Sequence, residues 1–540
     1  MLKGEAALSE VRRLLEGEPP ILTLLVYEPD WRKGAARIFA CGTAAGCCLL
    51  APQKETLEQV LELASIIAST RAVDTINQLR AKGVTTRHRW IDVETTEKLL
   101  LAGREFKDVP QALQARGLEP LADPKDGLTA LSTNVTTIAA WTKIVTPLLK
   151  RQGLVEASRL ETGTTTAIAD LEWYGLPFDR QRWDAMLRRH EEARSKAFET
   201  LGGQGLSLSE ELLNNPKAFQ AALKSAGIQV TDTKRDTLMT LPPPLGACFE
   251  QLLLAQQTIR AYGGRFLSFD RGDGRLRSRF EQIGASTGRL SSHSPNLQSI
   301  SAEDEARHAF CAPAERVLVV ADYAGCELRI LAEMSGDETF QEAFLKGEDL
   351  HAKVASKIWR TEVSKEHNAE LRHRAKAINF GLMYGMGADG LAKRLSIQKH
   401  EAQTLMNDYF NQFPKVRGFL DTQSQRGVRE GSIASVSGRT LLVDPKDPKT
   451  TRVARNMPIQ GSSADITKLA LARIRNALLS AKLDAHLVHT VHDEILVEGN
   501  RNDAEQLGQL VRTAMEEAGA QWIHAVPMKA DVSVGDVWAK

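Results

Sequence analysis

The sequence predicts an α/β unit, then a mainly helical stretch, then a region that mixes strands and helices. A chain of 540 residues is too long for one ordinary domain, so we expect two to four compact units. Over residues 1–155, strand-like apolar runs alternate with helix-like runs, which is typical of an α/β fold. Helical periodicity dominates from 156 to 270, and both patterns occur after residue 270.

Composition limits the classes of protein that fit. Hydrophobic residues make up 42% and charged residues 25%, as in soluble globular proteins. No apolar run reaches the roughly eighteen residues of a membrane span, and the first twenty residues lack the apolar segment of a secretory signal. The six cysteines show no CxxC spacing, which argues against a zinc site or a disulfide framework. We therefore expect a cytoplasmic protein that is not secreted and has no membrane partner.

The net charge of +1 gives no global argument for nucleic-acid binding. Arginines and lysines do cluster locally, in residues 271–280 and 371–380. Such clusters can neutralise phosphates while the whole chain stays near neutral, although a solvated charged face is the commoner cause.

Local patterns predict the individual elements in chain order. Apolar runs bounded by turn residues predict strands, and 3.6-residue periodicity predicts helices. The predicted strands are 21–27, 46–52 and 316–325, and the predicted helices are 56–70, 138–153, 180–201, a pair within 206–228 that turns at Asn214–Pro216, 401–413 and 463–481.

The stretch HTVHDEILVE, residues 489–498, consists of two short apolar strands separated by His492, Asp493 and Glu494. A solvated turn is the ordinary explanation for such a polar triplet. The alternative is a turn that presents a carboxylate for chemistry, and this alternative requires a second carboxylate elsewhere in the chain.

Asp322 is the best candidate for that second carboxylate. It follows the β-rich run Val317–Val320, and helical periodicity begins within a few residues. A carboxylate at a strand end is held rigidly and still reaches substrate, and two such groups can bind Mg²⁺ while phosphates complete its coordination. A helix N-cap is the alternative role for an aspartate in this position.

A third stretch, LRHRAKAINFGLMYGMG, repeats functional side chains every four residues. Arg372, Lys376, Phe380 and Tyr384 then share one stripe of a helix. Two cations followed by two aromatic rings suit a nucleoside triphosphate, because the cations meet phosphates and the rings meet sugar and base. An ordinary amphipathic helix explains this alternation less well, since a stripe is normally either buried or solvated.

Together these three stretches resemble motifs A, B and C of family A DNA polymerases, the DNA polymerase I family. Motif A is matched by DYAGCELR from Asp322 to Arg329, motif B by the Arg372–Gly385 stretch, and motif C by the VHDE of the hairpin. Further similar segments are TGRLSSHSPNLQSI, EDLHAKVA and RVARNMPIQGSSADITK, and the resemblance extends from about 156 to 540. Ala324, Gly325 and Cys326 depart from the family pattern, and we expect them to tune activity without abolishing it.

The resemblance implies an α+β polymerase right hand of palm, fingers and thumb, preceded by an α/β ribonuclease H-like domain of the exonuclease type. It also implies a template-directed DNA-dependent DNA polymerase for replication or repair, with dNTPs and primer–template DNA as its partners. A monomer with no 5′-nuclease domain is expected, as in phage-like enzymes. The implied domains are an exonuclease-like domain at 1–155, thumb at 156–275, palm at 276–345 and 425–540, and fingers at 346–424.

The resemblance also assigns roles to individual residues. Asp322 and Asp493, with the backbone carbonyl of Tyr323, would bind two Mg²⁺ ions, which Mn²⁺ could replace. Glu494 would lie beside the metals. Lys376 would act as general acid toward the pyrophosphate. The remaining assignments are Arg372, Lys376, His351, Phe380, Tyr384 and the sugar gate Glu327 at the dNTP, and Arg289, Asn296, Gln298, Arg452, Asn456, Gln460 and His492 at the DNA.

The first 155 residues lack most of the acids of a 3′–5′ proofreading exonuclease. Val26 stands where the first strand should carry an Asp, and only Glu28 remains there. Asp92 and Glu94 come too late in the sequence, and no tyrosine occurs between Tyr27 and Tyr174 to supply the later Y-x-x-x-D element. We predict an inactive exonuclease fold, with a weak or unconventional nuclease as the alternative.

Two other functions remain open. A single-subunit phage-type RNA polymerase shares the palm, but Glu327, Phe380 and Glu494 count against it. The second is a DNA-binding scaffold whose active site has lost its activity. The retained carboxylates count against it, because two nearby acids are costly without a function.

Overall fold

The structure is a computed structural model, and it describes residues 1–27, 31–32, 34–123, 127–302 and 304–538. The chain divides into two compact units. Unit 1 comprises Met1–Gly175, Ser278–His293 and Val319–Val534, and unit 2 comprises Leu176–Arg277, Ser294–Leu318 and the residues from Gly535 onward.

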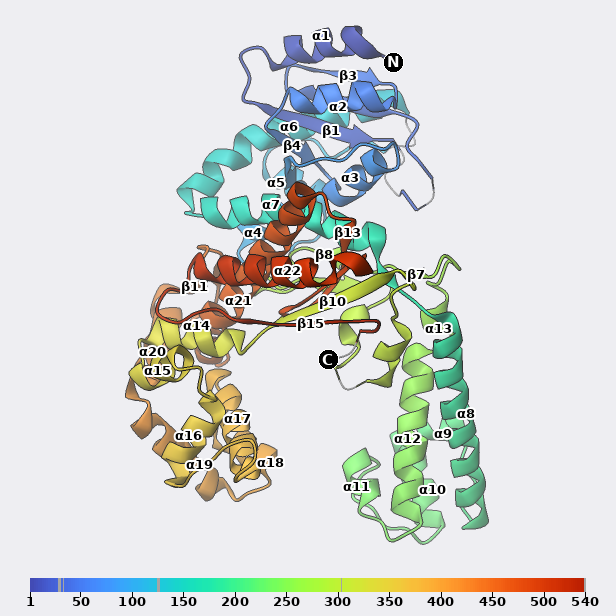
Figure 1. The fold of residues 1–540 in the computed structure, drawn as a ribbon, viewed down its shortest axis with the longest axis vertical. Helices are drawn as coiled ribbons and strands as arrows, with labels where there is room; N and C mark the ends of the chain where they lie inside the picture. The colour runs from blue at the N-terminus through green and yellow to red at the C-terminus, as the bar shows by residue number, and fades with distance from the viewer. Residues whose placement is uncertain (28–30, 33, 124–126, 303, 539–540) are drawn as a thin grey trace. The chain divides into compact units, whose positions relative to one another are not determined.

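Unit 1 begins with a mixed five-stranded sheet in the order β3-β2-β1-β4-β5 (Figure 1). Strand β1 runs antiparallel to β2 and parallel to β4, so a meander is joined to a parallel α/β segment, and the predicted α/β architecture is confirmed. The strands are β1 Ile21–Val26, β2 Phe39–Thr43, β3 Gly46–Leu50, β4 Ile66–Ser69 and β5 Arg89–Asp92; the helices are α1 Gly4–Leu15, α2 Lys54–Glu62, α3 Ala72–Arg80, α4 Val93–Leu101, α5 Val109–Ala115 and α6 Leu128–Arg151.

The helix predicted at 56–70 is wrong in its second half. Helix α2 ends at Glu62, and Ile66–Ser69 form the strand β4 between β1 and β5. Ile67 is fully buried there. The β-branched Ile66–Ile67 pair fits a central strand better than a helix, and parallel pairing on both sides decides the outcome.

Helix α7 (Val155–Tyr174) packs against the long helix α21 (Thr450–Ala481) through buried charges. The Glu161 carboxylate accepts from the ammonium of Lys468 at 2.6 Å and also bonds the Arg439 guanidinium. Arg439 in turn donates to Asp465, and all four side chains are at most 4% exposed. Opposite charges compensate one another in this cluster, which joins segments about 300 residues apart in the sequence.

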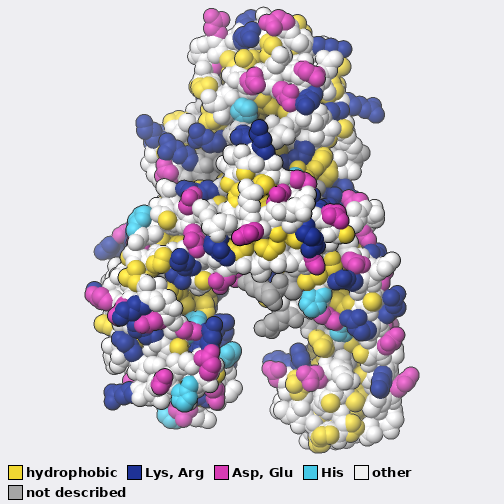
Figure 2. All heavy atoms as spheres, viewed as in Figure 1, with side chains coloured by type: hydrophobic (Ala, Val, Ile, Leu, Met, Phe, Trp, Pro, Cys, Tyr) yellow, Lys and Arg dark blue, Asp and Glu magenta, His cyan; other side chains and the backbone are white. Residues whose placement is uncertain are grey.

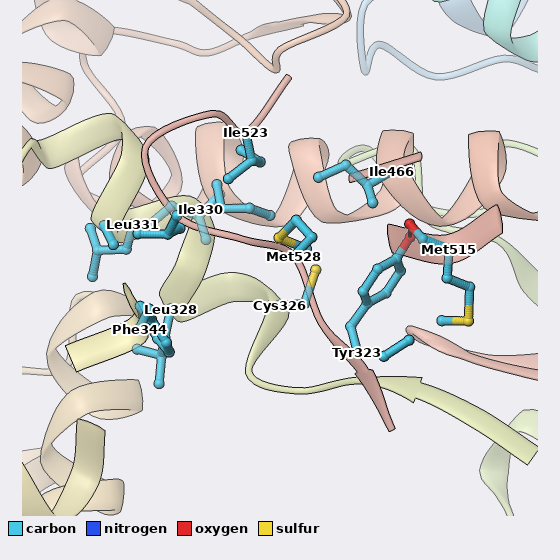
Figure 3. Close-up of a cluster of buried hydrophobic side chains, with 14 of the residues drawn as sticks. Tyr323, Cys326, Leu328, Ile330, Leu331, Phe344, Ile466, Met515, Ile523 and Met528 are labelled. Carbon is cyan, nitrogen blue, oxygen red and sulfur yellow. Dashed lines mark hydrogen bonds between the residues drawn. The ribbon is translucent and has the colours of Figure 1, made fainter. Parts of the chain in front are cut away.

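A second sheet of unit 1 has the order β13-β14-β10-β15. A large buried hydrophobic cluster surrounds it, and Figure 3 shows Tyr323 and Cys326 pointing into that cluster, near Met515 and Met528. The hydroxyl of Tyr323 donates to the backbone carbonyl of Met515 at 2.6 Å. The elements are β10 Arg316–Tyr323, of which unit 1 holds the part from Val319, β13 Ala485–Val491, β14 Glu494–Asn500, β15 Ala530–Gly535, α14 Cys326–Ser335, α21 and α22 Ala504–Ala520.

Six helices between residues 338 and 430 also belong to unit 1. Helices α16 and α17 pack together, and the second of them carries the predicted stripe of cations and rings. The stripe is helical through Phe380, whereas Tyr384 lies just past the last helical residue. The helices are α15 Glu338–Leu345, α16 Leu350–Trp359, α17 Ala369–Met383, α18 Ala388–Leu395, α19 Lys399–Gln412 and α20 Pro414–Glu430.

Unit 2 is mainly helical, as predicted for this stretch. Helices α8 (Arg180–Gly203) and α12 (Leu245–Tyr262) pack along each other, and the fully buried Trp183 stacks on Phe266 with ring centroids 4.7 Å apart. The predicted helical pair within 206–228 is confirmed by α9 and α10. The remaining helices of the unit are α9 Glu210–Leu213, α10 Pro216–Ser225, α11 Arg235–Met239 and α13 Gly264–Leu267.

The surface is mixed in charge. On the face drawn in Figure 2, acidic and basic side chains are interspersed, in keeping with the net charge of +1. Within the described ranges, no helix has both the length and the hydropathy needed to cross a bilayer.

Candidate active site

The HTVHDEILVE stretch is a tight β-hairpin. Val491 of β13 pairs with Glu494 of β14, so the loop consists of only His492 and Asp493. His492 has φ 55°, because two-residue hairpin loops need a left-handed residue to match the twist of the strands. The predicted strand–turn–strand is confirmed, and Glu494 is the buried first residue of β14 rather than part of the loop.

Neighbouring strands of one sheet position Asp322 and Asp493. Asp322 lies at the end of β10, and β10 is hydrogen-bonded to β14, which follows Asp493 directly. Burial raises the pKa of Asp493 to about 7, and the negative charge of Asp322 adds to the shift. The sheet thus brings together two carboxylates that are 171 positions apart in the sequence.

Asp322 does not have the N-cap role that the sequence left open. Helix α14 starts at Cys326, and its N-cap residue is Gly325, with φ 69°. This glycine allows the chain to turn sharply from β10 into α14, a conformation that disfavours residues with a Cβ. Asp322 is therefore placed before the turn, at the strand end.

Glu327, in the first turn of α14, is the centre of a hydrogen-bonded cluster. Arg289 donates to its Oε1 at 2.5 Å, and the hydroxyl of Tyr384 donates to its Oε2. Burial, followed by the charge of Glu327, raises the pKa of Tyr384, and its hydroxyl also interacts with Gln460. The structure therefore brings together the predicted sugar gate, one predicted dNTP-binding residue and two predicted DNA-binding residues.

Helix α21 contributes two further predicted DNA-binding residues beside Tyr384. The amide of Asn456 donates to the backbone carbonyl of Tyr384 at 3.3 Å. Arg452 lies against Gly385, where an added Cβ would come within 2.8 Å of the Arg452 side chain. Gly385 also has φ 72°, so both its backbone and its neighbour favour glycine.

The predicted phosphate-binding residues lie on α16 and α17. Arg372 donates to Asp349 at 2.6 Å, and Asp349 also caps α16 by accepting from the amide of Ala352. Lys376 is exposed, and among the described residues it has no ion-pair or hydrogen-bond partner. Phe380 lies between His351 and Tyr384, with ring centroids 5.8 Å and 6.2 Å away.

Two predicted DNA-binding residues belong to unit 2. Asn296 and Gln298 flank Leu297 at a short 3₁₀ turn, Leu297–Ser299, whereas the other predicted site residues are in unit 1. Asn296 and Gln298 therefore belong to a different unit from the carboxylates of Asp322 and Asp493.

Sequence reasoning missed two residues of this site. Asp349 was not assigned a role, although an aspartate directly before a helical run is a recognisable N-cap signal. Asn379 was also missed. It lies beside Phe380, is fully buried, and contacts His351. The helical stripe gave no signal for Asn379, because Asn379 is not a member of it.

The acids considered for nuclease chemistry have structural partners. Asp92 caps α4 by accepting from the amide of Thr95, and it also accepts from the amide of Ala72. Glu94 pairs with Lys98 at 2.7 Å. Val26 lines a cavity of about 470 Å³ together with Leu25, Leu121 and Leu131. Glu28 lies outside the described residues.

No group of three or more His, Cys, Asp or Glu side chains arranged to bind a metal ion was found in the described part of the chain. The pair Asp322 and Asp493 remains the arrangement to be tested for cation binding.

Known DNA polymerases are similar to this chain in sequence. Residues 207–540 match DNA polymerase family A. DNA polymerase I of Chloroflexus aurantiacus is 31% identical over 431 residues, covering 74% of this chain and 45% of that protein. The thermostable DNA polymerase I of Thermus thermophilus is 39% identical over 277 residues, covering 49% of this chain and 32% of that protein. The chain thus spans only a third to a half of the length of these curated relatives.

A solved structure agrees over nearly the whole chain. It is described as the POL domain of Pol1 from M. smegmatis in complex with DNA primer-template and dNTP. Its TM-score is 0.84 at 27% identity, covering 99% of this chain and 98% of that chain. The fold is therefore that of a DNA polymerase I polymerase domain with an N-terminal mixed α/β sheet domain of the exonuclease-like kind. The chain belongs to DNA polymerase family A.

Proposed function

We propose that this chain is a DNA-dependent DNA polymerase that adds dNTPs to the 3′-hydroxyl of a primer, in DNA replication or repair. The observation that carries the proposal is the carboxylate pair positioned by neighbouring strands, in which burial and the charge of Asp322 raise the pKa of Asp493. Family membership supports the same activity.

Two Mg²⁺ ions, for which Mn²⁺ could substitute, fit this pair. The charge of Asp322 disfavours the ionised form of the half-buried Asp493, so a divalent cation would stabilise the pair, and oxygen ligands suit Mg²⁺. Asp322, Asp493 and the backbone carbonyl of Tyr323 would hold the ions, with Glu494 beside them. When bound, the ions lower the pKa of the primer hydroxyl and neutralise charge on the triphosphate.

The chain's own side chains handle the nucleotide. Arg372 and Lys376 neutralise the triphosphate, and Lys376 donates a proton to the leaving pyrophosphate. Arg372 is paired with Asp349 in this structure, so it must release Asp349 in order to bind the triphosphate. Phe380 and Tyr384 pack against sugar and base.

Glu327 excludes ribonucleotides in this proposal. Its two carboxylate oxygens are held by Arg289 and Tyr384, so the side chain is fixed in place. A fixed carboxylate is a better steric gate than a mobile one, because it cannot rotate away from a 2′-hydroxyl.

Residues around α21 and the hairpin hold the primer–template. Hydrogen-bond donors suit the minor groove, where the acceptors are nearly independent of sequence, so pair geometry can be checked without choosing a sequence. The proposed DNA contacts are Arg289, Asn296, Gln298, Arg452, Asn456, Gln460 and His492.

The domain assignment is part of the same proposal. We assign the helices α8 and α12 of unit 2 to the thumb, the sheet β13-β14-β10-β15 to the palm, and the helices α16–α19 to the fingers. The predicted boundaries at 155, 275, 345 and 424 stay predictions, and unit 1 includes α7.

One gel tests the central activity. A 5′-labelled primer on a longer template is incubated with the protein and Mg²⁺, with and without the four dNTPs. We expect extension that requires dNTPs, is abolished by EDTA, and is absent from Asp322→Ala. DNA binding without extension under every condition would favour the scaffold function instead.

We further propose that the N-terminal domain does not proofread. Val26 contributes an apolar side chain to a cavity that Arg71 and Glu94 also line, Asp92 is engaged with two backbone amides, and Glu94 is paired with Lys98. The same gel tests this, because the primer should stay intact without dNTPs. Shortening of the primer by both the wild type and Asp322→Ala would contradict it.

A further inference from the structure

Asn379 is a fully buried polar residue in the contact between α16 and α17. It lies in α17 between Ile378 and Phe380, and it is 0% exposed. Its side-chain nitrogen lies 3.0 Å from Nδ1 of His351 in α16. Burying an amide costs free energy unless its groups are hydrogen-bonded, so this single contact needs an explanation.

The oxygen of the same amide shows the free-energy cost of this burial. Among the described residues, the side-chain oxygen of Asn379 is buried and has no hydrogen-bond partner. A leucine at this position would leave no buried polar atom. The amide is therefore kept for the one interaction that it makes, which is with the imidazole of His351.

The direction of this hydrogen bond fixes the proton on the ring. An amide nitrogen can only donate, so Nδ1 of His351 accepts and carries no proton. The remaining proton of a neutral imidazole is then on Nε2. Within the part of the chain that the structure describes, Nε2 has no protein partner, so its N–H is available to a ligand.

The surroundings keep this ring neutral. Burial lowers the pKa of His351 to about 4; nearby Asp349 opposes the shift, while Arg372 and Lys376 favour it. These charged groups belong to the two helices that meet at the ring. A neutral ring offers one directional donor and adds no further cation beside Arg372 and Lys376.

We propose that Asn379 is a positioning residue that holds His351 as the neutral Nε2–H tautomer, so that the ring donates one hydrogen bond to the triphosphate of the incoming nucleotide. This inference rests on the proposed polymerase function. The hydrogen bond also fixes the rotation of the ring, whose other neighbour is Phe380 at 5.8 Å. Asn379 acts through His351 and does not itself touch the nucleotide.

A double-mutant cycle tests the coupling. Asn379→Leu keeps the number and branching of the side-chain heavy atoms and removes the donor. We expect it to raise the KM for dNTP about tenfold with little change in kcat, the effect of losing one hydrogen bond to a charged group. In a His351→Ala background the same substitution should have no further effect on KM.

Ile378→Val is the matched control, because it changes a neighbouring buried residue and leaves the amide intact. Its KM should equal that of the wild type. A purely structural role for Asn379 would instead give equal KM effects in both backgrounds, which overturns the inference.

The tautomer has its own readout, independent of activity. With ¹⁵N-labelled histidine and His351→Ala for assignment, the wild-type protein should show His351 protonated at Nε2 and unprotonated at Nδ1. Asn379→Leu should show a mixture of tautomers. A ring protonated at Nδ1 in the wild type would overturn the inference even if the protein extends primers. Failure to extend primers with Nε2 protonated would instead count against the proposed function alone.

Discussion

Arg289 and Glu327 form an ion pair, with Nη2 of the arginine 2.5 Å from Oε1 of the glutamate. The second carboxylate oxygen of Glu327 accepts from the hydroxyl of Tyr384. One carboxylate therefore joins the segment before β9 (Ser291–His293), the start of α14 and the end of α17. This arrangement is the basis of the first prediction.

Glu327→Ala should relax discrimination against ribonucleotides. Removing the carboxylate opens the space that a 2′-hydroxyl would occupy, so the dNTP-to-rNTP ratio of kcat/KM should fall by roughly 10- to 200-fold. Single-nucleotide insertion with each substrate measures the ratio.

Glu327→Gln is the control for this experiment, because it keeps the volume of the side chain while losing the charge and one of the two acceptor oxygens. Its sugar selectivity should stay close to that of the wild type. Equal relaxation by both variants would mean that charge, and not volume, sets the gate.

Phe380→Tyr should increase the use of dideoxynucleotides. The added hydroxyl can replace the hydrogen bond that a missing sugar 3′-hydroxyl no longer makes, which is worth about tenfold in kcat/KM for ddNTP. Incorporation of ddTTP against dTTP on one template measures this. An unchanged ratio would show that Phe380 does not face the sugar.

Glu161→Leu should strongly destabilise the protein. Lys468 is 1% exposed, and its ammonium donates to the carboxylate of Glu161. The substitution removes this carboxylate and leaves the buried ammonium without its hydrogen-bonded anion. We expect a loss of about 3–5 kcal/mol in the free energy of unfolding. Urea denaturation followed by fluorescence or circular dichroism measures the loss.

The exposed pair of Arg12 with Glu5 provides the comparison. Glu5→Gln should change the free energy of unfolding by less than about 1 kcal/mol, because exposed ion pairs contribute little. If Glu161→Leu lost as little stability as Glu5→Gln, the buried cluster would contribute little to the stability of the fold.

Asp92→Asn should change how stability depends on pH. Burial raises the pKa of Asp92 from 3.8 to about 6, so the folded protein binds more protons than the unfolded chain between these values. The wild type should therefore lose stability as pH rises from about 4 to about 6, by up to about 2–3 kcal/mol. Asparagine cannot ionise, so the variant should lack this component.

Denaturation of both proteins across that pH range measures the difference. The gap in free energy should widen in favour of Asp92→Asn as pH rises, and stay constant above about pH 7. A gap that narrows with rising pH would mean that the backbone amides of Ala72 and Thr95 outweigh burial.

Features that depend on local pattern could be read from the amino-acid sequence alone. Alternating apolar residues and a short polar break predicted the hairpin that carries Asp493, and four-residue spacing predicted the helix that carries Arg372, Lys376 and Phe380. Three motifs in the correct order also identified the family. These features are readable because strand and helix periods are properties of neighbouring residues.

Contacts between residues far apart in the sequence became visible in the folded structure. Arg289 reaches Glu327 over 38 positions, and Asn379 reaches His351 over 28. The same is true of β4, where pairing with β1 and β5 prevailed over a helical pattern. Such contacts depend on how sheets and helices pack together, and that packing leaves no period in the sequence by which Asn379 or Asp349 could have been recognised as part of the site.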